Sequence, residues 1–472
     1  MARFKSVTSE LVQELKLIVG DDNVLTQQEE REPYSCDEMP IPKPNLPDVV
    51  VKPKNTVEVA RVLAAANAAQ IAVTPRGAGT GLSGGAIPIF GGIVLSLERL
   101  NHIKEIDTDN FVAVVEPGVT LADLYQAVES QGLYYPLYPG EKTAHIGGNV
   151  ATNAGGMRAL KYGVTRNFVL GLEAVLPTGQ IIRTGGKFVK CSTAYDLTQL
   201  LIGSEGTLAV ITEVTLRLTT PPGCREVLFI PFPGLRQAIK TVPEILKQGI
   251  PLMGLEFLEK DAIDILEKYL DREIPFHEHE AFLMGIVEAN TEDEVHQAAN
   301  RVAEVCTANG AIDIYIPASE RARRELLEAR EKLYFALKST GPIEVIDVVV
   351  PRSQIAEFVS KVKEISRSYG IPILAIGHAG DGNVHLQPMS RGMDREEWQT
   401  KLPQVMKEVY QAGIALGGTI SGEHGLGFEK KGYLSMAVSQ DQIDLMARLK
   451  RAFDPNYILN PGKGMNRTSR HP

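Results

Sequence analysis

Five glycines occur within nine residues, Gly77–Gly85, and this run limits the fold more than any other part of the chain. Glycines let several backbone N–H groups converge on one phosphate, and the preceding Arg76 adds positive charge. Gly79–Gly84 has the spacing G-x-G-x-x-G, but in dinucleotide-binding folds that motif opens a helix. Here a proline and two glycines follow at once, and then an apolar strand pattern. We therefore expect a phosphate-binding loop that joins two strands, at 71–74 and 93–97.

A second glycine-rich block covers 139–156 and alternates glycine with small side chains and two asparagines. A large flat ligand can lie close to such a backbone, because few bulky side chains intervene.

The chain changes character at Pro221 and Pro222. Beyond Arg225, strands alternate with longer charged helices and glycine becomes sparse, which predicts a separate α+β domain. Four parts are therefore expected: an N-terminal helical extension (1–45), a ligand-binding domain (46–221), a second domain (222–415) and a C-terminal segment (416–465). The predicted helices are 56–69 (with Thr56 as N-cap), 121–131, 235–247, 261–269, 291–309, 319–338, 354–369, 396–416 and 440–453.

The composition excludes several classes of protein. The net charge of −9 argues against nucleic-acid binding and leaves no basic patch for a membrane surface. No apolar run approaches the ~20 residues of a transmembrane segment, and the first 20 residues lack the features of a secretion signal. The 4 cysteines are scattered without a Cys-x-x-Cys pair, so no iron–sulfur cluster or structural zinc site is expected. A reduced, cytoplasmic protein is the simplest interpretation.

Two histidines flank a predicted tight turn at Asp381–Gly382. The dipeptide Asp-Gly is typical of the two-residue type I′ turn of a hairpin. Counting outward from that turn places His378 directly opposite His385, with Cβ atoms roughly 4.5–5.5 Å apart. A third ligand is available in the glycine-rich stretch Ser421–Gly427, which contains Glu423. Two histidines and one carboxylate suit a divalent Fe, Zn or Mn ion. The alternative is a pair of core histidines in an ordinary hairpin.

Taken together, these motifs resemble one known family. The family is the vanillyl-alcohol-oxidase/p-cresol-methylhydroxylase (PCMH) superfamily. Its FAD-binding domain is similar to three segments of this chain, Pro75–Gly85, Ile146–Gly156 and Gly203–Leu208. The branch with the glycolate-oxidase FAD subunit and D-lactate or D-2-hydroxyglutarate dehydrogenases is similar to His378–His385, Ser421–Gly427 and Asn460–Lys463. The resemblance implies an α+β fold: a two-subdomain PCMH-type FAD-binding domain over 46–221, a cap domain on an antiparallel sheet over 222–415, and a C-terminal segment that returns to the flavin site.

The resemblance also implies which residues bind FAD. Arg76 to Ser83 would hold the pyrophosphate, and Glu205, Gly206 and Ile211 would lie near the adenine and ribose. The full set implied is Pro75, Arg76, Gly77, Ala78, Gly79, Thr80, Gly81, Leu82, Ser83, Pro139, Gly140, Gly147, Gly148, Ala151, Thr152, Asn153, Gly155, Gly156, Gly163, Glu205, Gly206, Ile211 and Asn460.

For the reaction, the resemblance implies a metal held by His378, His385 and Glu423, with His424 as general base and Arg330 on the substrate carboxylate. His424 has an alternative role as a fourth metal ligand, and Arg330 as a surface ion pair within its own helix. The implied activity is the oxidation of a small D-2-hydroxy acid to the 2-oxo acid, with the hydride passing to flavin N5. Electrons would then pass to an electron-transferring flavoprotein, an iron–sulfur subunit or a quinone.

Two departures from the family pattern refine these expectations. Thr80 stands where some members carry a histidine that tethers the flavin, so FAD is expected to be non-covalent. Val345 stands where 2-hydroxyglutarate enzymes carry a lysine two residues before Asp347, which favours D-lactate or glycolate over D-2-hydroxyglutarate. The remaining alternatives are a lipid-ether synthase, whose run of consecutive histidines is not found in this sequence, and a non-catalytic FAD electron-transfer subunit.

Overall fold

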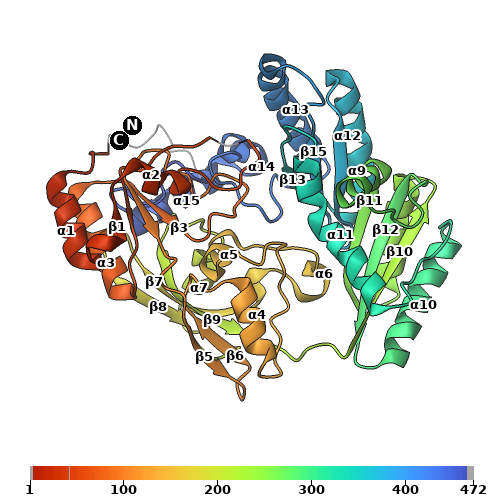
Figure 1. Ribbon diagram of the computed structural model, residues 1–472, viewed down its shortest axis with the longest axis horizontal. Coiled ribbons are helices and arrows are strands. Elements are labelled where there is room, and N and C mark those ends of the chain that lie inside the picture. The colour runs from red at the N-terminus through yellow and green to blue at the C-terminus, as the bar shows by residue number, and fades with distance from the viewer. Residues whose placement is uncertain (1–3, 42, 465–472) are drawn as a thin grey trace. The chain divides into compact units, whose positions relative to one another are not determined.

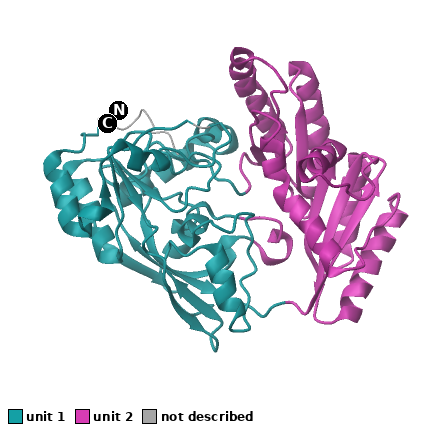
Figure 2. Ribbon diagram, in the orientation of Figure 1, with its two compact units in different colours: residues 1–154, 164–221, 423–472 teal, residues 155–163, 222–422 magenta. Residues whose placement is uncertain are grey.

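The computed structural model describes residues 4–41 and 43–464, and the chain forms two compact units (Figure 2). Unit 1 takes the described residues within 1–154, 164–221 and 423–472, whereas unit 2 consists of 155–163 and 222–422. Each unit has its own hydrophobic core.

Unit 1 contains two sheets. The first has the order β1-β2-β4-β3, with parallel pairing except between β1 and β2, and its strands are β1 (Val24–Leu25), β2 (Val49–Val51), β3 (Val73–Arg76) and β4 (Ile93–Ser96). The second is antiparallel with the order β5-β6-β9-β7-β8, and its strands are β5 (Ile103–Asp107), β6 (Val112–Val115), β7 (Val169–Val175), β8 (Ile181–Gly185) and β9 (Val210–Arg217). The first glycine-rich loop joins β3 to β4, so the prediction that it bridges two strands is confirmed.

The helices of unit 1 are α1 (Ser9–Val19), α2 (Gln28–Arg31), α3 (Thr56–Ala69), α4 (Leu121–Glu129), α5 (Ile146–Thr152), α7 (Leu197–Leu201), α14 (Leu434–Ala437) and α15 (Gln440–Phe453). The expected N-cap of α3 is wrong by one residue: the Asn55 side chain accepts from Glu58 N, and Thr56 is the first helical residue. Helix α5 was not predicted, because glycine lowers helix propensity. It ends at Asn153, which adopts the left-handed conformation (φ 54°).

Unit 2 is built on one antiparallel sheet with the order β10-β12-β11-β14-β15-β13 (Figure 1). Its strands are β10 (Cys224–Phe232), β11 (Leu252–Glu259), β12 (Ala281–Ala289), β13 (Ile346–Val349), β14 (Ile373–His378) and β15 (Asn383–Pro388). Its helices are α6 (Ala159–Tyr162), α8 (Leu235–Lys247), α9 (Lys260–Leu270), α10 (Glu292–Ala308), α11 (Glu320–Lys338), α12 (Ile355–Tyr369) and α13 (Arg395–Ala415).

Helices α9 and α11 cover one face of this sheet through a common apolar cluster that includes Leu374 and Ile376 of β14. Side chains alternate between faces along a strand, so His378, two residues beyond Ile376, projects toward the same face. Val348 of β13 belongs to the opposite face, where it lies against Gly413 of α13. The candidate ligands of unit 2 therefore project toward the side covered by α9 and α11.

The β14–β15 hairpin differs from its prediction. His378 pairs with Asn383, and His385 pairs with Ile376, so the loop holds four residues (379–382) instead of two. The His378 carbonyl accepts hydrogen bonds from Asp381 N at 3.2 Å and Gly382 N at 3.1 Å. These two hydrogen bonds close the wider turn. The two histidines are therefore diagonal neighbours, and they still share a face because a slip of two residues preserves the alternation.

In the described part of the chain, no helix combines the length and the apolar character that a membrane crossing requires.

Candidate active site

The first glycine-rich loop of unit 1 folds onto the Arg76 guanidinium. Arg76 donates to the carbonyls of Cys36 (2.7 Å) and Pro33 (3.2 Å), and it lies 5.6 Å from the ring centroid of Tyr34. A Cβ on Gly79 would lie 2.1 Å from Arg76 Nη2 and the residue has φ 82°, so a larger side chain would displace the guanidinium and strain the backbone. Arg76 thus anchors the loop to the N-terminal segment.

The C-terminal segment closes on the same loop. Asn460 donates to the carbonyls of Gly85 (3.1 Å) and Glu205 (2.7 Å). The Glu205 carboxylate in turn accepts from Leu426 N (2.8 Å) and Gly427 N (2.6 Å). Two of the predicted cofactor residues therefore join three distant parts of unit 1.

Lys463 is a further anchor between the C-terminal segment and this loop. Its ammonium donates to the carbonyls of Gly85 (3.1 Å) and Ile87 (2.5 Å). Burial lowers the pKa of Lys463 to about 7, although the carboxylates of Asp37 and Glu205 oppose this shift.

The residues of unit 1 fit a flat, phosphate-bearing cofactor. A Cβ built on Gly85, Gly140 or Gly148 would meet nothing within 4 Å, so the backbone there borders open space. His145, which precedes α5, has a buried Nδ1 with no hydrogen-bond partner among the described residues. Burial also lowers the pKa of His145, so the neutral ring is available to a ligand.

Most of the predicted FAD residues belong to unit 1, but three do not. Gly155, Gly156 and Gly163 lie in the short stretch 155–163 that belongs to unit 2.

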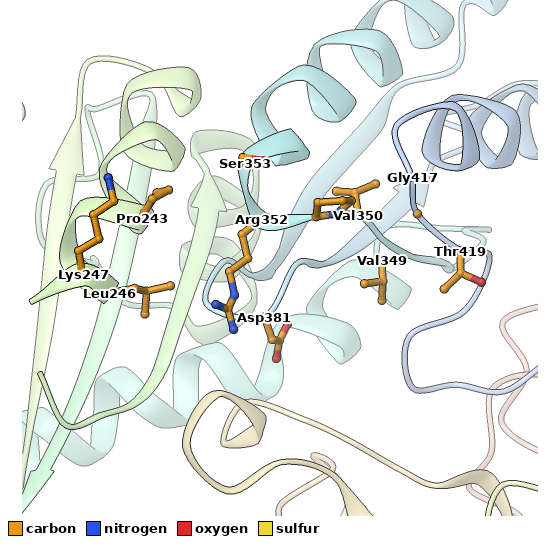
Figure 3. A pocket seen from close by; sticks show the side chains of 12 residues that line it. Pro243, Leu246, Lys247, Val349, Val350, Arg352, Ser353, Asp381, Gly417 and Thr419 are labelled. Carbon is orange, nitrogen blue, oxygen red and sulfur yellow. The ribbon is translucent and has the colours of Figure 1, made fainter. Parts of the chain in front are cut away.

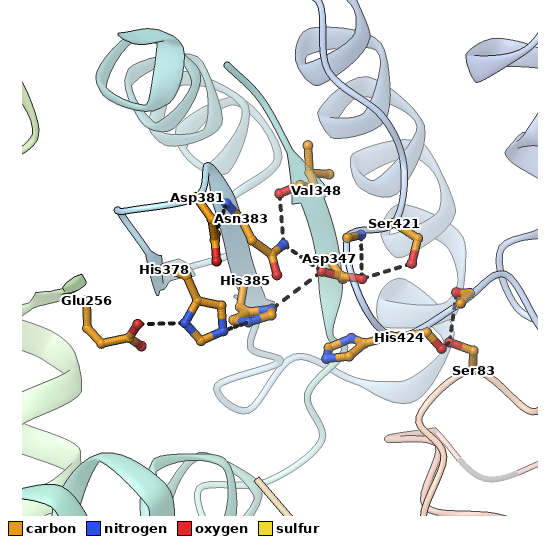
Figure 4. A network of polar contacts seen from close by, with 12 residues as sticks. Ser83, Glu256, Asp347, Val348, His378, Asp381, Asn383, His385, Ser421 and His424 are labelled. Atoms are coloured by element: carbon orange, nitrogen blue, oxygen red, sulfur yellow. Dashed lines mark hydrogen bonds and ion pairs between the residues drawn. The ribbon is translucent and has the colours of Figure 1, made fainter. Parts of the chain in front are cut away.

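In unit 2, His378 and His385 lie next to each other (Figure 4). Their Nε2 atoms are 3.3 Å apart, and their rings are almost perpendicular, at 87°. Two nitrogens that bind one divalent ion at ~2.1 Å are separated by about 3.0–3.4 Å for interligand angles between 90° and 109°. The observed separation therefore fits two ligands of a single ion.

A fully buried glutamate fixes the first histidine. Glu256 of β11 accepts from His378 Nδ1 through Oε1 at 2.7 Å, and its Oε2 pairs with Arg330 Nη2 at 2.7 Å. Burial alone would raise the pKa of Glu256, but its interactions with His378 and Arg330 hold that pKa below its ordinary value. Arg330 is thus a largely buried partner of a strand residue, and within the described part of the chain it makes no ion pair inside α11, contrary to the alternative from the sequence.

Asp347 of β13 organises the other side of the site. This fully buried carboxylate accepts from Asn383 Nδ2 (2.7 Å), Ser421 Oγ (2.8 Å) and Gly422 N (2.9 Å) (Figure 4). Its Oδ1 is also 3.7 Å from His385 Nδ1. Asp347 therefore holds the strand end and the loop that carries the last candidate ligands.

Glu423 and His424 directly follow Gly422, so chain connectivity keeps them close to Asp347. Two donor sets have ligand atoms within 4.8 Å of one another: the first is His378, His385 and Glu423, and the second is Asp347, His385 and His424. In the second set, the Asp347 oxygens already accept three hydrogen bonds, which leaves fewer lone pairs for an ion.

Unit 2 also has an open pocket of about 770 Å³, and the residues that line it do not include His378 or His385. Apolar residues of α8 and β13 line it, together with Arg352 and with Asp381 from the hairpin loop (Figure 3). The two histidines are buried, and their ligand atoms lie within 4.8 Å of one on Glu423.

Sequence reasoning missed Glu256 and His145 and gave Asp347 no role in the site. Two of these residues carry a recognisable signal, because a lone acid inside an apolar strand, such as Glu256 within 252–258 or Asp347 within 345–350, is buried only when it is paired. The His145 signal is weaker, since polar residues before a helix are common.

Comparisons with known proteins agree with this architecture. Two family models match, "FAD binding domain" over 47–185 and "FAD linked oxidases, C-terminal domain" over 222–464. Three relatives match over nearly their full length: an uncharacterised FAD-linked oxidoreductase of Mycobacterium tuberculosis (42% identity, 96% of this chain and 98% of the relative), a D-lactate dehydrogenase of Anaerostipes hadrus (40%, 98% and 98%) and the glycolate oxidase subunit GlcD of Bacillus subtilis (39%, 97% and 97%).

The fold is shared with p-cresol methylhydroxylase, whose solved structure matches with a TM-score of 0.78 at 18% identity over 98% of both chains. The predicted α+β PCMH-type fold, with a C-terminal domain on an antiparallel sheet, is therefore confirmed. The chain belongs to the FAD-linked oxidases of the vanillyl-alcohol-oxidase/PCMH superfamily, close to D-lactate dehydrogenases and glycolate oxidase GlcD.

Proposed function

We propose that this FAD-linked oxidoreductase oxidises a small D-2-hydroxy acid, D-lactate or glycolate, to the 2-oxo acid with the help of one divalent metal. The observation that carries the proposal is the pair of imidazole Nε2 atoms 3.3 Å apart, beside the buried Glu256 and its partner Arg330. A metal ligand set next to a cation that binds carboxylates suits a substrate with an α-hydroxyl and a carboxylate.

The oxidation removes a hydride from the α-carbon and a proton from the α-hydroxyl. When bound, FAD supplies the two-electron acceptor and the metal supplies a Lewis acid for the hydroxyl. His378, His385 and Glu423 would hold the metal, and the His424 imidazole would accept the hydroxyl proton. Arg330 would hold the substrate carboxylate, and residues of the glycine loops would hold FAD without a covalent bond.

The proposed preference for a small monoacid rests on Val345, which is buried and apolar. The second carboxylate of a diacid would need a cation at this position. The electrons are proposed to leave through a partner protein or a quinone, since this chain carries no Cys-x-x-Cys motif for a cluster.

Anaerobic mixing with hydroxy acids tests the proposal. D-lactate and glycolate should bleach the flavin absorbance, whereas L-lactate should not. A much higher kcat/KM for D-2-hydroxyglutarate, or no bleaching by any of these acids, would contradict it.

A further inference from the structure

Glu256 joins the two halves of the candidate active site. Its carboxylate is fully buried, and it divides its oxygens between His378 Nδ1 and Arg330 Nη2, each at 2.7 Å. The sheet register explains this position, since Glu256 of β11 is paired directly with His378 of β14. Directly paired residues project from the same face, so the carboxylate and the imidazole are neighbours by construction.

The contact with His378 determines which nitrogen can bind a metal. A histidine that donates its Nδ1 proton to a carboxylate keeps Nε2 unprotonated and its ring in a fixed orientation. In this chain, that Nε2 is the atom directed at His385 Nε2.

The contact with Arg330 orients the guanidinium. Arg330 extends from α11 to Glu256, 74 positions earlier in the chain, and its side chain is 13% exposed. Its Nε has no hydrogen-bond partner among the described residues, so the guanidinium keeps a donor for a second carboxylate.

We propose that Glu256 is a positioning residue that orients the metal ligand His378 and the carboxylate-binding Arg330 at the same time. This inference rests on the proposed function, because it takes His378 as a ligand and Arg330 as a substrate contact. Glu256 would then set the distance between the metal and the Arg330 guanidinium, which together bind a 2-hydroxy acid.

The substitution Glu256→Gln tests this directly. A glutamine has one acceptor oxygen and one donor nitrogen, so it satisfies His378 or Arg330 but not both. The affinity of the FAD-loaded protein for Mn²⁺, measured by competition with a chelator, should fall by about 10–100-fold.

Glu288 offers a matched control. It is a fully buried carboxylate on β12 of the same sheet, and it also accepts from cations, Arg225 (2.5 Å) and Lys161 (3.1 Å). Glu288→Gln should lower the melting temperature as Glu256→Gln does, yet leave the Mn²⁺ affinity within about twofold.

Kinetics give a second readout that a general loss of stability does not reproduce. At saturating Mn²⁺, Glu256→Gln should recover kcat while its KM for D-lactate stays raised, because Arg330 remains misplaced. Should Glu256→Gln fail to fold, Glu256→Asp replaces it, since the shorter side chain cannot reach both partners.

Wild-type Mn²⁺ affinity in Glu256→Gln, or equal losses in Glu256→Gln and Glu288→Gln, would overturn the inference. The variant His378→Ala separates this failure from that of the proposed function. If His378→Ala loses the metal while Glu256→Gln keeps it, only the positioning role is wrong; if His378→Ala also keeps the metal, the metal site itself is wrong.

Discussion

His424 follows Glu423 directly, and each of the two residues has a ligand atom within 4.8 Å of one on His385. If Glu423 ligates the metal, the His424 imidazole is left to act as the proton acceptor, a role that histidine commonly fills in enzymes. The backbone of this residue is fixed, because its carbonyl accepts from Ser83 Oγ at 2.9 Å.

His424→Ala should therefore keep FAD and metal but lose roughly 10²–10⁴-fold in kcat, the usual contribution of a positioned base. His385→Ala should instead lose metal and activity together. Flavin content, metal content and single-turnover flavin reduction separate the two roles. Equal metal loss in both variants would make His424 a ligand.

Thr80 predicts how the flavin is attached. A threonine hydroxyl at this position cannot form the histidyl bond that tethers FAD in some relatives of the superfamily, so acid precipitation should leave the yellow colour in the supernatant. Colour retained in the pellet would contradict non-covalent binding.

Lys463 predicts a pH dependence of stability. Its folded pKa of about 7 lies below the unfolded value of ~10.4, so the unfolded state binds more protons between these values. The free energy of unfolding should therefore rise with pH across this window. Relative to Lys463→Met, wild type should gain on the order of 2 kcal/mol between pH 7 and pH 9 in urea unfolding. A difference that does not change with pH would show that Lys463 stays charged when buried.

At the scale of elements, the sequence predicted the helices of unit 2 closely, because long amphipathic segments have a strong period. Helix α8 was predicted with its observed bounds, and so was α15 of unit 1. The hairpin register was wrong by two residues because Asp381–Gly382 was assigned to a tight turn, while the chain forms a four-residue loop. The histidines still share a face, since only an odd slip would separate them.

The link between Arg330 and Glu256 could not be predicted from helix spacing. Spacing rules compare residues three or four apart, and this pair is separated by 74 positions. Likewise, nothing local in the sequence indicates that Glu205 caps the backbone of Leu426 and Gly427, a contact between segments 221 or more positions apart.

The contact of Gly427 with the first glycine-rich loop predicts the effect of an added methyl group. A Cβ at Gly427 would lie 2.0 Å from the Ser83 carbonyl oxygen, and the residue has φ 49°. Gly427→Ala should therefore lose about 1–3 kcal/mol of unfolding free energy and bind FAD more weakly.

Gly432→Ala is the matched control, because its Cβ meets nothing within 4 Å and its φ is not positive. It should stay within about 0.5 kcal/mol of wild type in the same melting experiment. Equal stability and equal FAD occupancy in both variants would mean that this junction does not support the cofactor site.

At the scale of the whole chain, two family models and relatives of about 40% identity identify an FAD-linked oxidase. The proposed reaction further requires that a metal acts together with the flavin. None of the residues proposed for the metal is among those proposed for FAD. Removal of the metal should therefore leave the flavin in place.

The most direct test is anaerobic flavin reduction by D-lactate in protein stripped of metal with a chelator. The stripped protein should keep its FAD but reduce it at least about 10²-fold more slowly, and added Mn²⁺, Zn²⁺ or Fe²⁺ should restore the rate. Reduction by D-lactate at the same rate with and without metal would contradict a metal-assisted oxidation.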